Sequence, residues 1–137
     1  MKEEDIARKW ADKVSANFKE GTEEAAFLRD IFEGLLGFHS DDLIAKPRID
    51  ASGGDEPDAV IARKRTPDGL PSDIRVLIEI KSPVVQLDKR PGSKAFSPVE
   101  QAFNYTTKYD KDANPRFNWI IVTNFKELRL YHRDSQI

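Results

Sequence analysis

The chain has 137 residues, of which 39% are hydrophobic and 34% are charged, and its net charge is −2. This length and composition predict one soluble globular domain whose core is large enough to fold without a metal or disulfide. The absence of cysteine excludes disulfides, zinc–cysteine sites and thiol nucleophiles. No apolar run approaches the roughly 18 residues of a membrane span. Because the charged first ten residues are unlike a signal peptide, we expect a cytoplasmic protein.

Two amphipathic helices are predicted at the start of the chain. Apolar residues recur at a spacing of four over residues 3–19, which is typical of a helix with one buried face. The stripe consists of Ile6, Trp10, Val14 and Phe18. A second helix is predicted to begin with Thr22 as its N-cap and to end at Gly37, a residue type common at helix stops. Glu24 falls in the first turn of this helix, where the helix dipole favours negative charge.

A β-hairpin is predicted in the middle of the chain. Residues 40–56 are rich in Asp, Ser and Gly and predict a loop, with a short strand expected near residues 46–51. The β-branched alternation of residues 58–64 predicts one strand, and the more apolar residues 74–81 predict a central one. Between them, residues 66–73 combine proline and glycine in the order that favours a chain reversal.

A well-defined helix start follows the hairpin. Residues 82–97 predict a loop. Ser97 suits the N-cap, Pro98 suits the first helical position, and Glu100 completes the pattern of a capping box. The sequence therefore predicts a helix that runs from this start to about Tyr109.

Two more strands are predicted over residues 117–124 and 128–133, joined by a short turn at 124–127. The predicted order is helix, helix, three strands, helix and two strands. This order favours an α/β fold in which helices flank a mixed central sheet of about four to five strands.

Three charged residues stand out in the predicted hairpin. Asp58 opens the first strand, whereas Glu79 and Lys81 lie two apart in an otherwise apolar strand, so their side chains share one face. A buried charge is costly without a partner, so charges in a central strand call for pairing or function. Taken alone, the pattern is common, and an edge strand or a solvated Glu79–Lys81 pair is its ordinary explanation.

The hairpin can bring Asp58 beside Glu79, and neighbouring carboxylates repel unless a cation lies between them. Mg²⁺ prefers oxygen ligands and needs only one or two carboxylates, with Mn²⁺ as the expected substitute. The backbone carbonyl of Ile80 is a further candidate ligand. Such a cation acidifies a water for attack on a phosphodiester, while Lys81 would orient or deprotonate that water or stabilise the transition state.

Three motifs follow one another along the chain: Pro57-Asp58, Glu79-Ile80-Lys81, and Gln101 with Tyr105 on the following helix. Their order resembles the PD-(D/E)xK nuclease superfamily, and in particular the N-terminal nuclease domains of type I and type IIG restriction-modification enzymes. The resemblance implies a restriction-endonuclease-like fold and a Mg²⁺-dependent endodeoxyribonuclease. Gln101 and Tyr105 match its Q-x-x-x-Y motif and would face the active site and the nucleic-acid backbone; otherwise they belong to an ordinary half-buried helix.

The resemblance extends over residues 22–133. Residues 22–38 look like the opening helix of those nuclease domains, in which an early acidic residue completes the site. Glu24 is a better candidate for this residue than Glu23, because Glu24 lies in the middle of the apolar face and Glu23 at its margin. A favourable interaction with the helix dipole would explain an acid at this position equally well. Residues 120–133 resemble the final pair of strands. We therefore expect residues 1–20 to form an added helix before a nuclease core.

Double-stranded DNA is the partner that the resemblance implies. Lys64, Lys89, Arg90 and Lys94 are candidate DNA contacts, although short basic clusters are more often a solvated face. The sequence has no helix-turn-helix, zinc finger, P-loop or S-adenosylmethionine turn. We therefore expect residues 1–137 to be the N-terminal part of a longer polypeptide or complex that carries the recognition and methyltransferase modules. A transient dimer is expected because one site cuts one strand.

Two alternatives remain at this stage. The first is a non-catalytic module of the same fold that binds nucleic acid or a protein partner. The second is an RNA or junction nuclease that uses the same site. The intact set of Asp58, Glu79 and Lys81 favours catalysis, because degenerate sites usually lose one of the three.

Overall fold

A computed structural model describes residues 3–14, 20–47, 57–67, 71–89, 96–109 and 118–134. The elements follow in the predicted order of helices and strands. Their bounds are α1 Glu3–Val14, α2 Glu20–Phe27, η1 Leu28–Leu35, β1 Leu43–Ala45, β2 Ala59–Arg65, β3 Pro71–Ile80, α3 Pro98–Tyr109, β4 Trp119–Thr123 and β5 Leu128–His132. No helix in these ranges has the length and apolarity needed to cross a membrane.

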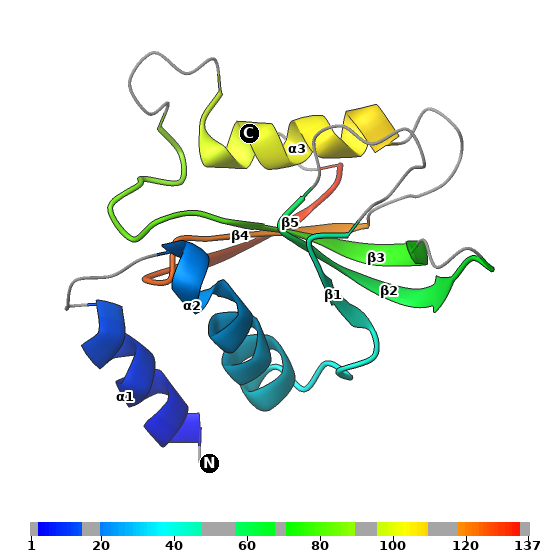
Figure 1. The fold of residues 1–137 in the computed structure, drawn as a ribbon. Helices are drawn as coiled ribbons and strands as arrows, with labels where there is room; N and C mark the ends of the chain where they lie inside the picture. The colour runs from blue at the N-terminus through cyan, green and yellow to red at the C-terminus, as the bar shows by residue number, and fades with distance from the viewer. Residues whose placement is uncertain are drawn as a thin grey trace.

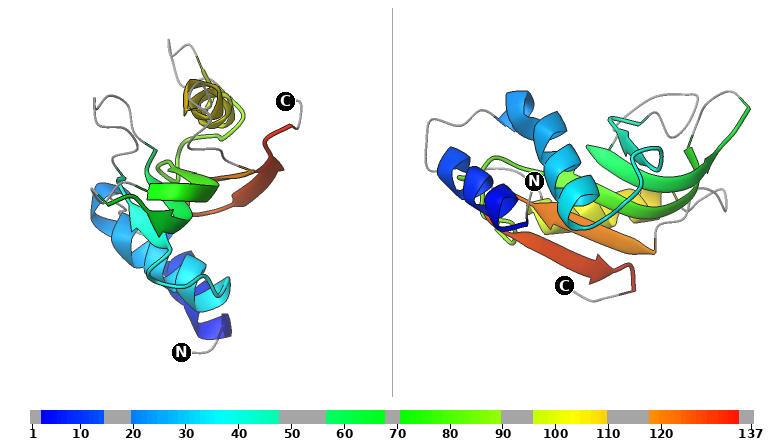
Figure 2. Two further views of the ribbon diagram at one scale, coloured as in Figure 1. Left: turned by 90° about the vertical axis from the view of Figure 1, so that its right-hand side faces the viewer. Right: turned by 90° about the horizontal axis from the view of Figure 1, so that it is seen from below.

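The five strands form one sheet in the order β1-β2-β3-β4-β5. Only β3 and β4 run parallel, and the other neighbours are antiparallel. The helix α3 connects the two parallel strands and covers one face of the sheet, whereas α1, α2 and η1 lie on the other face (Figures 1 and 2). The predicted α/β fold with a mixed, helix-flanked sheet is confirmed.

Each face of the sheet carries its own hydrophobic cluster, because side chains alternate between the faces along a strand. The α3-side cluster consists of Val60, Ala62, Ile74, Leu77, Leu87, Val99, Ala102, Tyr105, Ile120 and Val122. The α1-side cluster consists of Ile6, Trp10, Phe27, Leu28, Phe32, Ala59, Ile61, Val76, Ile78, Ile80, Ile121 and Phe125. Full burial of each large side chain contributes about 1.5–3 kcal/mol. These clusters therefore fix which way the remaining strand residues point.

A β-bulge shifts the pattern within the hairpin. Ile61 pairs with Val76, but Ala62 pairs with Ile74, so Arg75 is the extra residue of β3. The bulge places Ile74 in the α3-side cluster although Val76, two residues later, belongs to the α1-side cluster. Beyond the bulge the alternation is regular, and Glu79 shares the α3-side face with Leu77.

The second helix differs from the prediction at its start and in its middle. Because α2 begins at Glu20, Thr22 lies inside the helix and is not its N-cap. Residues 28–35 form a π-helix, and the Leu36 N–H donates to the Ile31 carbonyl five residues earlier. The predicted stop is confirmed, since Gly37 has a φ of +77°. In the first predicted helix, residues 15–19 lie outside the described residues.

Two strand boundaries also differ. The strand expected near residues 46–51 is misplaced, because β1 ends at Ala45 and Lys46 has a φ of +46°, which breaks the extended chain; residues 48–51 lie outside the described residues. The strand β3 begins at Pro71, three residues before the predicted start, since proline is tolerated at the first position of a strand. It ends at Ile80, so Lys81 directly follows the strand.

Candidate active site

Asp58 and Glu79 lie side by side at one end of the hairpin. The ladder pairs Ala59 with Ile78, and one step further along the antiparallel strands places Asp58 opposite Glu79. The Ile80 N–H donates a hydrogen bond of 2.6 Å to Asp58 Oδ2. On its other side, the Asp58 carbonyl accepts a bond of 2.7 Å from the Lys46 N–H. The juxtaposition predicted from the hairpin is therefore confirmed, and Asp58 is held in place from both neighbouring strands.

Glu79 is a buried acid, and the positive charge of Lys81 compensates only partly for its burial. Its exposed fraction is 3%, and its Oε2 has no hydrogen-bond partner in the part of the chain that the structure describes. Lys81 Nζ lies 3.7 Å from Glu79 Oε1, beyond hydrogen-bonding distance. The ordinary explanation of this pair as a solvated surface contact is excluded, because Glu79 is buried.

Burial raises the pKa of Glu79 to about 9, since the charged form loses its water. Asp58 acts in the same direction, because its carboxylate accepts a hydrogen bond from protonated Glu79 and repels ionised Glu79. Lys81 acts in the opposite direction and offsets only part of the increase. When Glu79 is ionised, the site therefore holds two adjacent carboxylates and one half-buried lysine, and a further positive charge would stabilise it.

The carboxylate site has two acids among the described residues. No group of three or more His, Asp or Glu side chains that could hold a metal ion forms within those ranges. Glu24 therefore does not join Asp58 and Glu79 in a three-carboxylate cluster. It lies on α2, whose Phe27 packs in the α1-side cluster, on the face opposite Glu79. A supporting role for Glu24 stays a prediction.

Gln101 and Tyr105 lie on α3, which covers the Glu79 face of the sheet. The predicted capping box starts this helix: the Glu100 N–H donates to Ser97 Oγ at 3.1 Å, and the Ser97 N–H donates to Glu100 Oε1 at 3.0 Å. Tyr105 is buried in the α3-side cluster and Gln101 is half-buried. The structure thus places both residues on the helix that covers the Glu79 face of the sheet, and their roles toward substrate stay predictions.

Lys64, one of the predicted DNA-binding residues, lies far from this site. Lys64 is exposed near the far end of β2, where it pairs with Ser72. It lies six residues further along the chain than Asp58, which corresponds to roughly 20 Å of extended strand. Lys89 is exposed after the turns that follow β3. Arg90 and Lys94 lie outside the described residues.

Thr123 and Asn124 are buried polar residues to which the sequence assigned no role. They end β4 and begin the turn to β5. The Thr123 carbonyl accepts from the Lys81 N–H at 2.8 Å, and Asn124 Nδ2 donates to the Val85 carbonyl at 2.9 Å. The sequence pattern that could have indicated them is a pair of polar residues directly after the apolar run Ile120–Val122, where a core strand ends.

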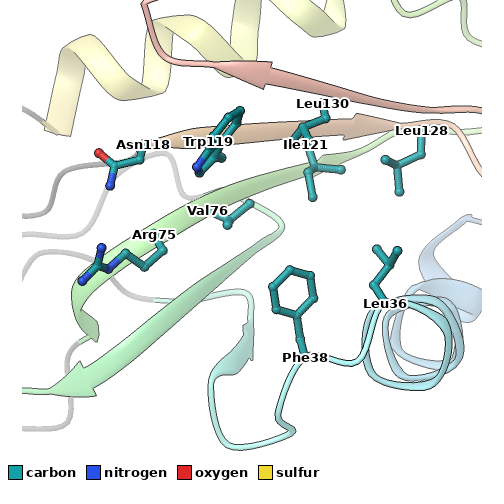
Figure 3. Close-up of a pocket in the computed structure, with 9 residues that line it drawn as sticks. All are labelled: Leu36, Phe38, Arg75, Val76, Asn118, Trp119, Ile121, Leu128 and Leu130. Carbon is teal, nitrogen blue, oxygen red and sulfur yellow. The ribbon is translucent and has the colours of Figure 1, made fainter.

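An apolar cavity lies away from the carboxylates, on the α1 side of the sheet (Figure 3). Its volume is about 530 Å³, and it opens between the end of η1 and the strands β3, β4 and β5. Its lining residues are Leu36, Phe38, Arg75, Val76, Asn118, Trp119, Ile121, Leu128 and Leu130. Because Val76 and Ile121 belong to the α1-side cluster, this cavity and Glu79 lie on opposite faces.

The family of the chain follows from comparison with known proteins. No curated protein and no solved structure matches it. A family model described as "MmeI, N-terminal domain" matches residues 1–137, which is the whole chain. The mixed, helix-flanked sheet fits the restriction-endonuclease-like fold that the motifs in the sequence predict. The chain therefore belongs to the MmeI N-terminal domain family, a family of restriction-modification enzyme domains.

Proposed function

We propose that this chain is a Mg²⁺-dependent endodeoxyribonuclease domain that hydrolyses phosphodiester bonds of double-stranded DNA within a restriction-modification enzyme. The observation that carries the proposal is the Asp58–Glu79 pair at the end of β3, with Lys81 next to it. Family membership supports the restriction-modification context.

The residues of the site fit a hard divalent cation. Glu79 Oε2 is a buried carboxylate oxygen that lacks a hydrogen-bond donor within the described residues. A cation beside it would relieve both its desolvation and the repulsion from Asp58. Mg²⁺ keeps several waters and is bound through one or two carboxylates, so the two acids suffice. The Ile80 carbonyl is the proposed third protein ligand, and Mn²⁺ is the expected substitute.

Each residue of the site would then have a separate role in cleavage. When bound, Mg²⁺ would supply an acidified water and offset the charge that develops on the phosphate. The Ile80 N–H keeps the Asp58 carboxylate in register with β3. The Lys81 side chain, half-buried beside Glu79, would orient the attacking water or stabilise the transition state as an ammonium, or would deprotonate that water as a neutral amine. Gln101 and Tyr105 would guide the DNA backbone from α3, with Glu24 as a supporting residue.

Nicking of supercoiled plasmid in Mg²⁺ or Mn²⁺ tests this function. The buffer needs low salt, because a net charge of −2 predicts weak affinity for DNA. Asp58→Ala and Lys81→Ala are expected to abolish nicking, whereas the matched controls Asp41→Ala and Lys126→Ala change exposed residues and should retain it. Cleavage that survives either of the first two substitutions would overturn the assignment.

A non-catalytic binding module is the second candidate. The apolar cavity favours it, because it is bordered by exposed side chains such as Trp119, Leu128 and Leu130, and large exposed apolar patches often mark interaction sites. Calorimetry with Mn²⁺ separates the two functions. The nuclease requires that the wild-type chain bind the ion and that Glu79→Ala lose binding, whereas a binding module predicts no such difference.

A further inference from the structure

We propose that Asn124 is a positioning residue for the candidate active site, because its side chain holds the segment that follows Lys81. The inference rests on the proposed function and names a residue outside the motifs that suggested it. Asn124 directly follows β4, the parallel neighbour of β3, at the end of the sheet where Lys81 follows β3. Asn124 would position Lys81 indirectly, by holding the backbone of the segment that follows it.

The Asn124 amide is buried and uses both its donor and its acceptor. Its exposed fraction is 6%. Nδ2 donates to the Val85 carbonyl at 2.9 Å. Oδ1 accepts from the N–H groups of Lys126 at 3.1 Å and Glu127 at 3.0 Å. An amide side chain satisfies these three groups at once, whereas a carboxylate lacks the donor and an apolar side chain lacks both.

Two consecutive residues therefore hold both ends of the segment from Lys81 to Val85. The Thr123 carbonyl accepts from the Lys81 N–H at 2.8 Å, which continues the parallel ladder one step beyond β3. Asn124 then fixes Val85, four residues further along. If the bond to Val85 is lost, this segment remains tied at Lys81 and at Leu87 but loses its anchor between them.

The same segment is joined to α3. The Val99 N–H, in the first turn of that helix, donates to the Leu87 carbonyl at 3.0 Å. Leu87 itself is fully buried in the α3-side cluster. A displacement of residues 82–87 would therefore also reach the helix that carries Gln101 and Tyr105. This connection gives Asn124 influence over two parts of the candidate site.

The turn that presents Asn124 is fixed from the other face of the sheet. Phe125 has a φ of +71°, a conformation that a residue with a side chain adopts only when its surroundings impose it. Its ring centroid lies 4.6 Å from that of Phe27 and 6.1 Å from that of Trp10. The aromatic packing of α1 and α2 thus sets the backbone beside Asn124, and the anchor for Val85 is rigid.

Asn124→Asp is the most direct test, because it is nearly isosteric. The carboxylate still accepts from Lys126 and Glu127, but it cannot donate to Val85. Amide hydrogen exchange should become faster over residues 82–89 while β5 stays protected. Mn²⁺ affinity should change by less than about threefold, and plasmid nicking should slow by about tenfold or more, since small displacements in an active site can cost up to a hundredfold. Unchanged exchange over residues 82–89 would overturn the proposal.

Leu35→Ala is the matched control. Leu35 packs against the α1-side cluster, away from the carboxylates, so the substitution lowers stability without touching the segment. An equal loss of nicking in both variants at equal stability would overturn the positioning role. Should Asn124→Asp not fold, exchange in the wild-type chain decides: the Val85 amide, which donates to the Ser82 carbonyl at 3.0 Å, must exchange more slowly than that of Val84, which is 85% exposed. Equally fast exchange at the two amides contradicts a rigid segment and therefore the proposal. Absence of nicking by the wild type would reject the proposed nuclease function. The exchange measurement would still show whether Asn124 holds residues 82–89.

Discussion

Asp58 Oδ2 accepts a 2.6 Å hydrogen bond from the Ile80 N–H, across 22 residues of sequence. This bond joins the two separated halves of the motif, because Ile80 lies between Glu79 and Lys81. It also gives one residue two functions: the N–H of Ile80 orients the first carboxylate, and its carbonyl is the proposed third ligand. The carboxylates are thereby held together by backbone geometry, although their charges repel.

Asp58→Asn should separate stability from metal binding. The amide oxygen can still accept from the Ile80 N–H, but the negative charge beside Glu79 is removed. The metal-free chain should become more stable at pH 8, by up to about 1.4 kcal/mol for each unit by which the Glu79 pKa falls below 8. Mn²⁺ binding should be lost. Urea unfolding and calorimetry on the same protein measure both effects. A variant that is less stable than the wild type and still binds Mn²⁺ would contradict the repulsion between Asp58 and Glu79 and the role of Asp58 as a ligand.

Stability of the metal-free chain should fall as the pH rises. The pKa of Glu79 is raised from 4.5 to about 9 by burial and by Asp58. Between these values the folded chain keeps a proton that the unfolded chain has released, so increasing pH favours unfolding, with a slope of at most about 1.4 kcal/mol per unit. Urea midpoints measured from pH 5 to pH 9 check this. Glu79→Gln should flatten the dependence; an equally steep fall in that variant would assign it to other groups.

Local chemistry explains what the sequence predicted well. The hairpin and the capping box at Ser97 depend on residues close in sequence, and the hairpin in turn fixes Asp58 opposite Glu79. The errors arise where tertiary packing decides. The π-helix at 28–35 follows no propensity signal, and the positive φ of Phe125 is imposed by aromatic packing. The partner of Asn124 is 39 residues away, so no local pattern could identify it.

Divalent cations should stabilise the folded chain. An ion that binds only the folded state adds about 2.7 kcal/mol at a concentration 100 times its dissociation constant. Thermal unfolding with increasing Mn²⁺ at pH 8 should therefore show a rising midpoint in the wild type. Glu79→Gln removes a proposed ligand and should show no rise. As a control, Asp41→Asn changes an exposed carboxylate and should respond like the wild type. A midpoint that rises equally in all three would reflect nonspecific ion binding.

Ser97→Ala tests whether the start of α3 is needed for the site. Ser97 Oγ accepts from the Glu100 N–H, and loss of such a cap costs about 1 kcal/mol. The unfolding free energy should fall by that amount, and Mn²⁺ affinity should stay unchanged because the carboxylates belong to the hairpin. Nicking should weaken more than metal binding if Gln101 and Tyr105 contact the DNA backbone, since fraying displaces their helix. Equal nicking by variant and wild type would instead limit α3 to covering the core.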